Sequence, residues 1–256
     1  MTITSRTQFP QLIDEMGLKV GAEVGVRVGA FSAHLLANSK LDLLHSIDPW
    51  TDDDTMTMAY TARMFKKNGR MQAFYEEAMD RLAKFGDRSR VVRKTSLEAV
   101  EGFKDGELDF LYLDASHLFT GFAMDMIRWW PKVRDGCVMA GHDYIRKSTY
   151  QVAYVVNGFC MEHLQRLMLT VEDTDTDGRP APSWWFVKEP KINRGRWMGR
   201  FASPDNPLIG QARALAPTTR VDIPYELLDI AAAANPGGPR LATSRGSAPA
   251  CARETW

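Results

Sequence analysis

The stretch Gly21-Ala22-Glu23-Val24-Gly25-Val26-Arg27-Val28-Gly29 places an acid and two spaced glycines where an apolar strand runs into a helix. Residues 18–22 are mostly apolar, and Phe31 and Leu35 fall on one face at helical spacing. Glycine lets the backbone turn sharply and approach a ligand closely. The N-terminal amides of the following helix point to the same place. The stretch therefore predicts a nucleoside-cofactor site at a strand-to-helix turn.

The spacing of the glycines separates two interpretations of this turn. A dinucleotide-binding turn has Gly-x-Gly-x-x-Gly, with glycines for the turn, the pyrophosphate approach and the packing of the helix. This chain has Glu23-x-Gly25-x-x-x-Gly29, which resembles motif I of the class I S-adenosylmethionine-dependent methyltransferases. The cofactor of that family has a charged methionine end and no pyrophosphate. An ordinary glycine-containing turn is the alternative when the motif is taken alone.

Two further apolar runs end in polar residues. The run 43–48 ends in Asp48, about 20 residues beyond the glycine turn, where ribose-binding carboxylates stand in nucleotide-binding sheets. Asp48 is therefore a candidate for binding the ribose hydroxyls, and its alternative role is to cap the segment after Pro49. The run 91–96 predicts another strand with Ser96 at its carboxyl end. The methyltransferase resemblance implies that this end lies near the adenine.

The fourth and fifth expected strands carry the second strong signal. The run 108–113 ends in Asp114-Ala115-Ser116-His117, and the strand 137–140 stops at Gly141-His142-Asp143-Tyr144. Ligands of parallel sheets bind in the crevice beyond the carboxyl ends of the strands. We therefore expect one edge of the sheet to gather Glu23, Asp48, Ser96, Asp114 and Asp143. Between these strands, apolar residues at helical spacing predict a helix that ends at Pro131. These residues are Phe119, Phe122, Ala123, Met126, Ile127 and Trp130.

The order of these strand-terminal residues resembles the methyltransferase group related to macrocin and sugar O-methyltransferases. The resemblance covers roughly residues 15–190 and is specific in 21–36, 108–117 and 136–144. It implies an α/β fold with a Rossmann-like, doubly wound, mostly parallel seven-stranded sheet that closes with an antiparallel hairpin. We expect the hairpin strands near 167–171 and 184–188, after a helix over 150–163.

We expect the chain to divide into a methyltransferase domain over 1–190, a C-terminal extension over 191–234 and a disordered tail over 235–256, which is rich in Pro, Gly, Ser and Ala. Within the domain, 51–90 is a helical insertion after the second strand, with helical patches over 56–67 and 71–85. It forms either a lid or subunit contact, or a plain crossover helix with a long loop. The basic and aromatic stretch 191–201 is either a substrate contact or a solvated tail.

Composition argues against several partners. The chain has 32 basic and 32 acidic residues, so its zero net charge makes nucleic acid an unlikely ligand and gives no general attraction to a membrane. No apolar run reaches transmembrane length, and the first residues lack a signal-peptide core. The three cysteines have no metal-ligand spacing, which favours a reducing compartment and a cytoplasmic location. A homo-oligomer is left open.

The residue types at the sheet edge suggest a mechanism. Glu23, Gly25, Gly29, Asp48, Ser96 and Asp114 are the expected cofactor-binding residues. Methyl transfer from a sulfonium is a direct displacement that needs an aligned acceptor and a group to take its proton. His142 is the first candidate for that base and His117 the second, with Asp143 beside them; either histidine could instead be structural.

A metal ion is the other way to activate a hydroxyl. Asp114 and Asp143 end neighbouring strands and could share a hard cation such as Mg²⁺. Some members of the resembled group use acids at these two positions in that manner. Where those members add a third acid, this chain has His142, which puts the metal in doubt.

Three classes of function follow. The leading class is a small-molecule O-methyltransferase that uses S-adenosylmethionine and acts on a sugar or natural-product hydroxyl. The second is an NAD-dependent oxidoreductase, disfavoured by the glycine spacing. The third is a non-catalytic nucleoside-binding module, since a fold does not fix an activity.

Overall fold

A computed structural model describes residues 3–51, 70–145, 151–174 and 178–189. The chain divides into two compact units, Met1–Lys191 and Ile192–Trp256, and every described residue belongs to the first. Its strands form one sheet in the order β3-β2-β1-β4-β5-β7-β6. The strands are β1 (Val20–Val24), β2 (Leu43–Asp48), β3 (Ser89–Arg93), β4 (Leu108–Leu113), β5 (Val133–Gly141), β6 (Met168–Leu169) and β7 (Trp184–Val187).

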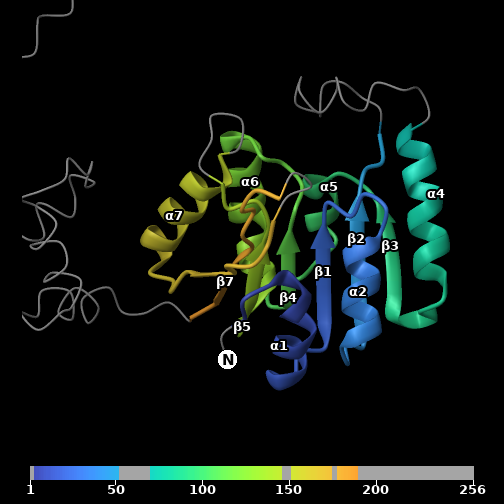
Figure 1. Cartoon of the computed structure of the whole chain (residues 1–256), viewed down its shortest axis with the longest axis horizontal. Helices are drawn as coiled ribbons and strands as arrows, with labels where there is room; N and C mark the ends of the chain where they lie inside the picture. The colour runs from blue at the N-terminus through green and yellow to red at the C-terminus, as the bar shows by residue number, and fades with distance from the viewer. Residues whose placement is uncertain (1–2, 52–69, 146–150, 175–177, 190–256) are drawn as a thin grey trace, which may run out of the picture. The chain divides into compact units, whose positions relative to one another are not determined.

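The first five strands run parallel, and β7 pairs antiparallel with both β5 and β6 (Figure 1). From β1 the chain builds outward through β2 and β3, and then returns to place β4 on the other side of β1. This reversal is the topological switch point at which open α/β sheets bind ligands. The predicted Rossmann-like sheet with its closing antiparallel hairpin is confirmed.

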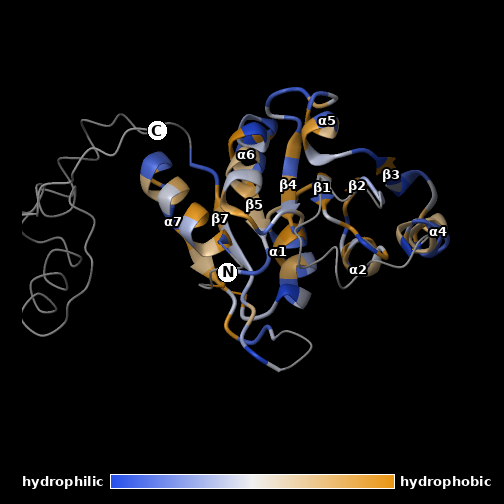
Figure 2. Cartoon of the chain, turned by 90° about the horizontal axis from the view of Figure 1, so that it is seen from above, coloured by the Kyte–Doolittle hydropathy of each residue, from blue (hydrophilic) through white to orange (hydrophobic). Residues whose placement is uncertain are grey.

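Helices cover both faces of the sheet. They are α1 (Phe9–Glu15), α2 (Ala30–Asn38), α4 (Arg70–Ala83), α5 (Ser96–Val100), α6 (Phe119–Trp129) and α7 (Val152–His163), with 3₁₀ turns at Arg6–Gln8, Gly86–Arg88 and Trp130–Lys132. Helices α1 and α2 lie on one face, and α5 and α6 on the other (Figure 2). Most residues of β1 and β2 and all six residues of β4 are buried, whereas β3 at the edge of the sheet has none that is fully buried. Burial on both faces explains the continuous apolar runs in the sequence.

Two expectations about local structure are corrected. Ser96 does not end a strand: β3 stops at Arg93, and Ser96 is the first residue of α5. Thr95 caps that helix, because its hydroxyl accepts the amide of Glu98 while the Glu98 carboxylate accepts the amide of Thr95. This capping box follows the apolar run at once and ends the strand early.

The buried stripe of α6 also differs from the predicted one. Phe122 and Met126 are buried as expected, but Phe119 and Ile127 are more than half exposed. The helix is rotated so that Asp125 and Trp129 face inward instead. Apolar residues surround most of this helix, so their periodicity alone does not fix its orientation.

The described part of the expected insertion behaves as a crossover helix. Helix α4 connects β2 with β3 and packs against α2. The packing is close, since a Cβ added at Gly29 would stand 3.3 Å from the Cα of Ala78. The other predicted helical patch, 56–67, the C-terminal extension and the tail lie outside the described residues.

Candidate active site at the carboxyl edge of the sheet

The glycine turn after β1 touches the end of β4. The Asp114 amide donates to the Val24 carbonyl at 2.7 Å, which continues the ladder between the two strands. Gly25 has a φ of +95°, and a Cβ added there would stand 2.1 Å from the Asp114 carbonyl oxygen. Only glycine fits this approach. The two most informative stretches of the sequence therefore meet at the switch point.

Asp48 holds the turn in place from the end of β2. One carboxylate oxygen accepts the amides of Val26 and Arg27 at 3.0 and 2.9 Å, and the other accepts the Trp50 amide at 2.9 Å. Burial raises the pKa of Asp48 against the opposing effect of these three bonds. Asp48 therefore caps the segment after Pro49, as considered from the sequence. It also caps the glycine turn through the amides of Val26 and Arg27.

Glu23 lies beneath the turn in a closed environment. Its side chain is 2% exposed, and its carboxylate accepts the Ser32 hydroxyl, which lies 2.7 Å from the Ser46 hydroxyl. Burial raises the pKa of Glu23 to about 8, so the acid is mostly protonated at neutral pH. Glu23 therefore shapes the base of the turn as a mostly neutral group.

A cavity of about 560 Å³ extends from the turn along the edge of the sheet. Of the six expected cofactor-binding residues, Gly25, Asp48, Ser96 and Asp114 line it, whereas Glu23 and Gly29 do not. Its apolar walls come from the segment after β2 and from α4, α5 and α6, and include Trp50, Met71, Phe74, Leu97 and Met124. A largely apolar cleft with a few convergent polar groups is typical of a small-molecule site.

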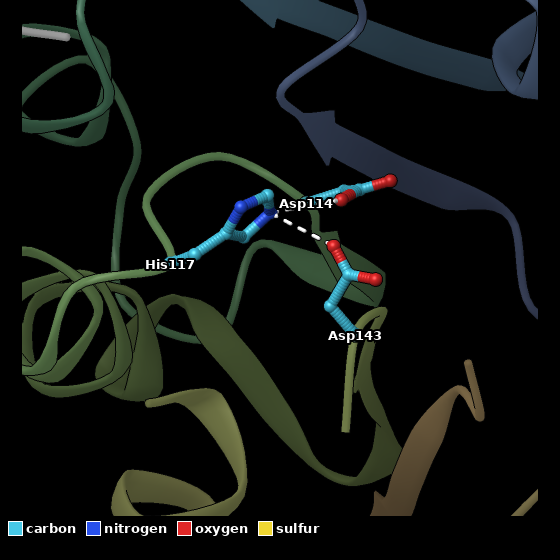
Figure 3. A group of neighbouring side chains, drawn as sticks. All are labelled: Asp114, His117 and Asp143. Atoms are coloured by element: carbon cyan, nitrogen blue, oxygen red, sulfur yellow. Dashed lines mark ion pairs between the residues drawn. The ribbon is translucent and has the colours of Figure 1, made fainter. Parts of the chain in front are cut away.

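Beside the cavity, Asp114, His117, His142 and Asp143 form one cluster. His117 Nε2 lies 3.0 Å from an Asp143 oxygen and 3.7 Å from Asp114 (Figure 3). His142 Nδ1 lies 3.3 Å from the other Asp143 oxygen and 3.9 Å from Asp114. All four residues were expected to gather where the acceptor lies. Asp114 joins the cluster to the cavity because it belongs to both.

The cluster is electrostatically coupled. Burial alone would lower the pKa of His117, but the neighbouring carboxylates of Asp114 and Asp143 outweigh it and raise that pKa to about 9. The pKa of His142 is raised, because Asp143 and Asp114 likewise outweigh burial. The two histidines in turn overcome the burial of Asp143 and lower its pKa. Two carboxylates and two imidazoles thus balance their charges within a half-buried site.

Three members of the cluster fit a divalent cation. One ligand atom from each of Asp114, His117 and Asp143 lies within 4.8 Å of the others. Two carboxylates and an imidazole form a reasonable donor set for such an ion. The sequence analysis named Asp114 and Asp143 for this role but not His117.

Arg6 is a charged residue near this edge that the sequence analysis missed. Its backbone amide donates to both oxygens of Asp173 at 2.9 and 3.0 Å, and its guanidinium carbon lies 5.1 Å from the Phe31 ring centre. Burial lowers the pKa of Arg6, but Tyr112, Asp114, Glu23 and Asp173 together raise it. Its guanidinium makes no hydrogen bond or ion pair with any other residue that the structure describes. No local sequence motif predicts that Arg6 lies near this edge of the sheet.

Comparisons with known proteins identify the type of domain. The family model for a methyltransferase domain matches residues 22–144. Similar solved structures include an O-methyltransferase from Bacillus cereus in complex with SAH, at 14% identity over 73% of this chain and 82% of that one, with a TM-score of 0.52. Another is the O-methyltransferase TomG from Streptomyces achromogenes with SAM, at 16% identity over 72% and 79%, with a TM-score of 0.50. No curated protein sequence matches the chain.

The structures establish the shared fold, and the family model adds the methyltransferase domain. The chain is an enzyme of the class I S-adenosylmethionine-dependent methyltransferase type. Of the three classes of function considered from the sequence, the methyltransferase is the one that these comparisons support. In the described part of the chain, no helix has the length and apolarity that crossing a bilayer requires.

Proposed function

We propose that the enzyme transfers a methyl group from S-adenosylmethionine to a hydroxyl of a small molecule, a sugar or a natural product. The observation that carries the proposal is the continuity at Asp114. This residue lines the cavity beside the glycine turn and also belongs to the Asp-His cluster. A cofactor in the cavity would present its methyl group to an acceptor held at the cluster. The names of the O-methyltransferase structures support the choice of oxygen.

The cofactor-binding roles follow from the cavity. Gly25 leaves room at the turn, Gly29 stands at the N-cap of α2, and Asp48 has lone pairs left to accept the ribose hydroxyls. Ser96 and Asp114 form further parts of the wall, and Glu23 supports the turn from below. We add Arg6 as the cation for the methionine carboxylate, because its guanidinium is charged and has no hydrogen-bond or ion-pair partner among the described residues.

The reaction needs a displacement and one proton transfer. The acceptor oxygen attacks the methyl carbon, the carbon–sulfur bond breaks, and S-adenosylhomocysteine leaves with the electron pair on sulfur. The hydroxyl proton goes to the neutral imidazole form of His142 first, or of His117 second above its pKa of about 9, while Asp143 lies beside both rings. Holding the acceptor in line supplies much of the rate.

A magnesium ion is the alternative means of activation. Asp114 and Asp143 would hold it, with His117 as a neighbouring donor, and when bound it would act as a Lewis acid on the acceptor oxygen. Turnover should then stop with EDTA and return with Mg²⁺. Turnover that is indifferent to EDTA removes the metal and leaves the histidine base.

Two measurements test the function. Calorimetry of the purified protein should detect S-adenosylhomocysteine but not NADH. Labelled S-adenosylmethionine, incubated with a panel of sugars and phenolic natural products, should yield a methyl ether. A methyl group found on nitrogen or sulfur would refute the proposed acceptor, and a lack of heat with S-adenosylhomocysteine would refute the cofactor.

A further inference from the structure

Residues 3–8, the N-terminal strap, are attached to the connection between β6 and β7. The Thr4 carbonyl accepts the amides of Val171 and Glu172, both at 2.9 Å. The first residue of the strap is 1% exposed and belongs to the main hydrophobic core. The strap therefore follows a fixed course, and it carries Arg6, whose charge the proposed function uses.

A single buried carboxylate makes most of the polar contacts at this junction. Asp173 lies between β6 and β7 and is 8% exposed. Its Oδ1 accepts the Ser5 hydroxyl at 2.8 Å, and both of its oxygens accept the Arg6 amide, at 2.9 and 3.0 Å. Oδ2 also accepts the hydroxyls of Thr170 at 2.5 Å and Ser183 at 3.2 Å. Burial would raise the pKa of Asp173, but these hydrogen bonds outweigh it and lower that pKa, so the acid is ionised at neutral pH.

The number of donors decides what Asp173 can still bind. A carboxylate offers about four lone-pair positions. Three hydroxyls and one amide already occupy them. The acid therefore holds the backbone of Arg6 and has no acceptor left for its guanidinium, although a guanidinium is the usual partner of a carboxylate. The arginine side chain stays available for another anion.

The other side of Asp173 is joined to the strand that leads to Asp114. The Ser183 hydroxyl donates its hydrogen to Asp173, so its oxygen accepts the Tyr112 hydroxyl at 2.9 Å. Tyr112 lies in the fully buried strand β4, two residues before Asp114. The anchor of the strap and the central acid of the active site are thus held by the same rigid strand.

The guanidinium of Arg6 lies close to the strand ends that form the active site. Its carbon is 5.1 Å from the Phe31 ring centre. Burial raises the pKa of Glu23, and the charge of Arg6 opposes that rise. Burial and the charge of Arg6 both oppose the raised pKa of His142. Because interactions between charges weaken with distance, a cation that acts on both residues is near the ends of β1 and β5.

We propose that Asp173 is a positioning residue, which fixes the backbone of Arg6 so that the guanidinium faces the carboxylate of the bound cofactor. This inference rests on the proposed use of S-adenosylmethionine and on the proposed contact of Arg6 with its methionine end. Without the anchor, the strap and the long arginine side chain must be ordered when the cofactor binds, and this ordering lowers the affinity. The loss should be limited to ligands that carry the carboxylate.

The test measures two affinities by calorimetry, for S-adenosylhomocysteine and for 5′-methylthioadenosine, which lacks the carboxylate. Asp173→Asn replaces one acceptor oxygen with an NH₂ group. It should weaken binding of S-adenosylhomocysteine by about fivefold and leave binding of 5′-methylthioadenosine unchanged. In an Arg6→Gln background, the same change should alter the affinity for S-adenosylhomocysteine by less than about twofold. Losses that add, or equal losses for both compounds, would overturn the inference.

Two further variants separate positioning from a loss of structure. Glu172→Gln removes the same charge from the adjacent exposed acid and should alter neither affinity. Ser5→Ala removes one hydroxyl bond to Asp173 and should weaken binding of S-adenosylhomocysteine alone, by about threefold. This milder variant carries the test if urea unfolding shows that Asp173→Asn is not folded, and an unchanged affinity would then overturn the inference. If the wild-type protein binds neither compound, the proposed cofactor fails first and the inference with it.

Discussion

The two halves of the carboxyl edge hold their acids in different ways. In the β1–β2 half, Asp48 is bonded to three backbone amides. In the β4–β5 half, Asp143 is ion-paired with the side chains of His117 and His142. Backbone amides do not titrate or rotate away, whereas imidazoles do both. The first half is therefore suited to holding a ligand of constant structure, and the second to moving a proton.

The largest expected effect tests this division in the β4–β5 half. His142→Gln should lower kcat by about 10²–10⁴-fold, because it removes the candidate base. Asp143→Asn should lower it to a similar degree, because it releases both rings. The affinity for S-adenosylhomocysteine, measured by calorimetry, should stay within about threefold in both variants. A large loss of affinity would show that the two halves are not separate.

The next effect tests the β1–β2 half. Gly25→Ala should weaken S-adenosylhomocysteine binding by at least about 30-fold and cost roughly 1–3 kcal/mol of stability, because its Cβ meets a backbone carbonyl. Gly17→Ala is the matched control: Gly17 also has a positive φ, +66°, but an added Cβ has nothing within 4 Å. Calorimetry and urea unfolding of both variants separate the clash from the strain. Equal losses in the two variants would contradict the close approach.

A smaller effect concerns the methionine end. Arg6→Gln should weaken S-adenosylhomocysteine binding by about tenfold, because it removes a charge-assisted bond to the carboxylate. Binding of 5′-methylthioadenosine, which lacks that carboxylate, should not change. The control is Arg90→Gln, an exposed arginine of β3. An equal loss for both nucleosides would assign Arg6 a structural role instead.

The smallest effect concerns Glu23, a buried acid beneath the glycine turn of the β1–β2 half. Its pKa is about 8 in the folded protein and about 4.5 for a glutamate in water, so ionisation favours the unfolded chain as pH rises between these values. Stability from the neutral form is full below pH 4.5 and is lost toward pH 8. Glu23→Gln should remove this dependence and raise stability at pH 7 by about 1–3 kcal/mol. Urea unfolding at pH 5, 7 and 8 measures it, and an unchanged pH slope would refute the assignment.

The sequence predicted the sheet well for a physical reason. Strands buried on both faces read as continuous apolar runs, and the acids and glycines that follow them mark where each run stops. Asp114, His117, His142 and Asp143 were therefore brought together correctly from two short stretches. Ser96 was assigned to the end of a strand, although it begins α5. The capping box of Thr95 and Glu98 follows the apolar run directly, so the hydropathy pattern does not separate the strand from the helix.

Two other residues could not have been found from pattern. Asp125 points inward from a helix whose apolar residues suggested a different face, and an acid is not expected on the buried side. Arg6 depends on Asp173, more than 160 residues away, for the anchoring of its backbone. Contacts of this kind arise from the folded topology and leave no local spacing to read.

The bonds from Asp48 to the amides of Val26 and Arg27 join atoms of the protein itself. The turn is therefore ordered during folding, together with the end of β2. An arriving cofactor meets a rigid rim at this end of the cavity, so little conformational entropy is lost there on association. Preorganisation of this kind favours tight retention of a nucleoside without further closure of the glycine turn.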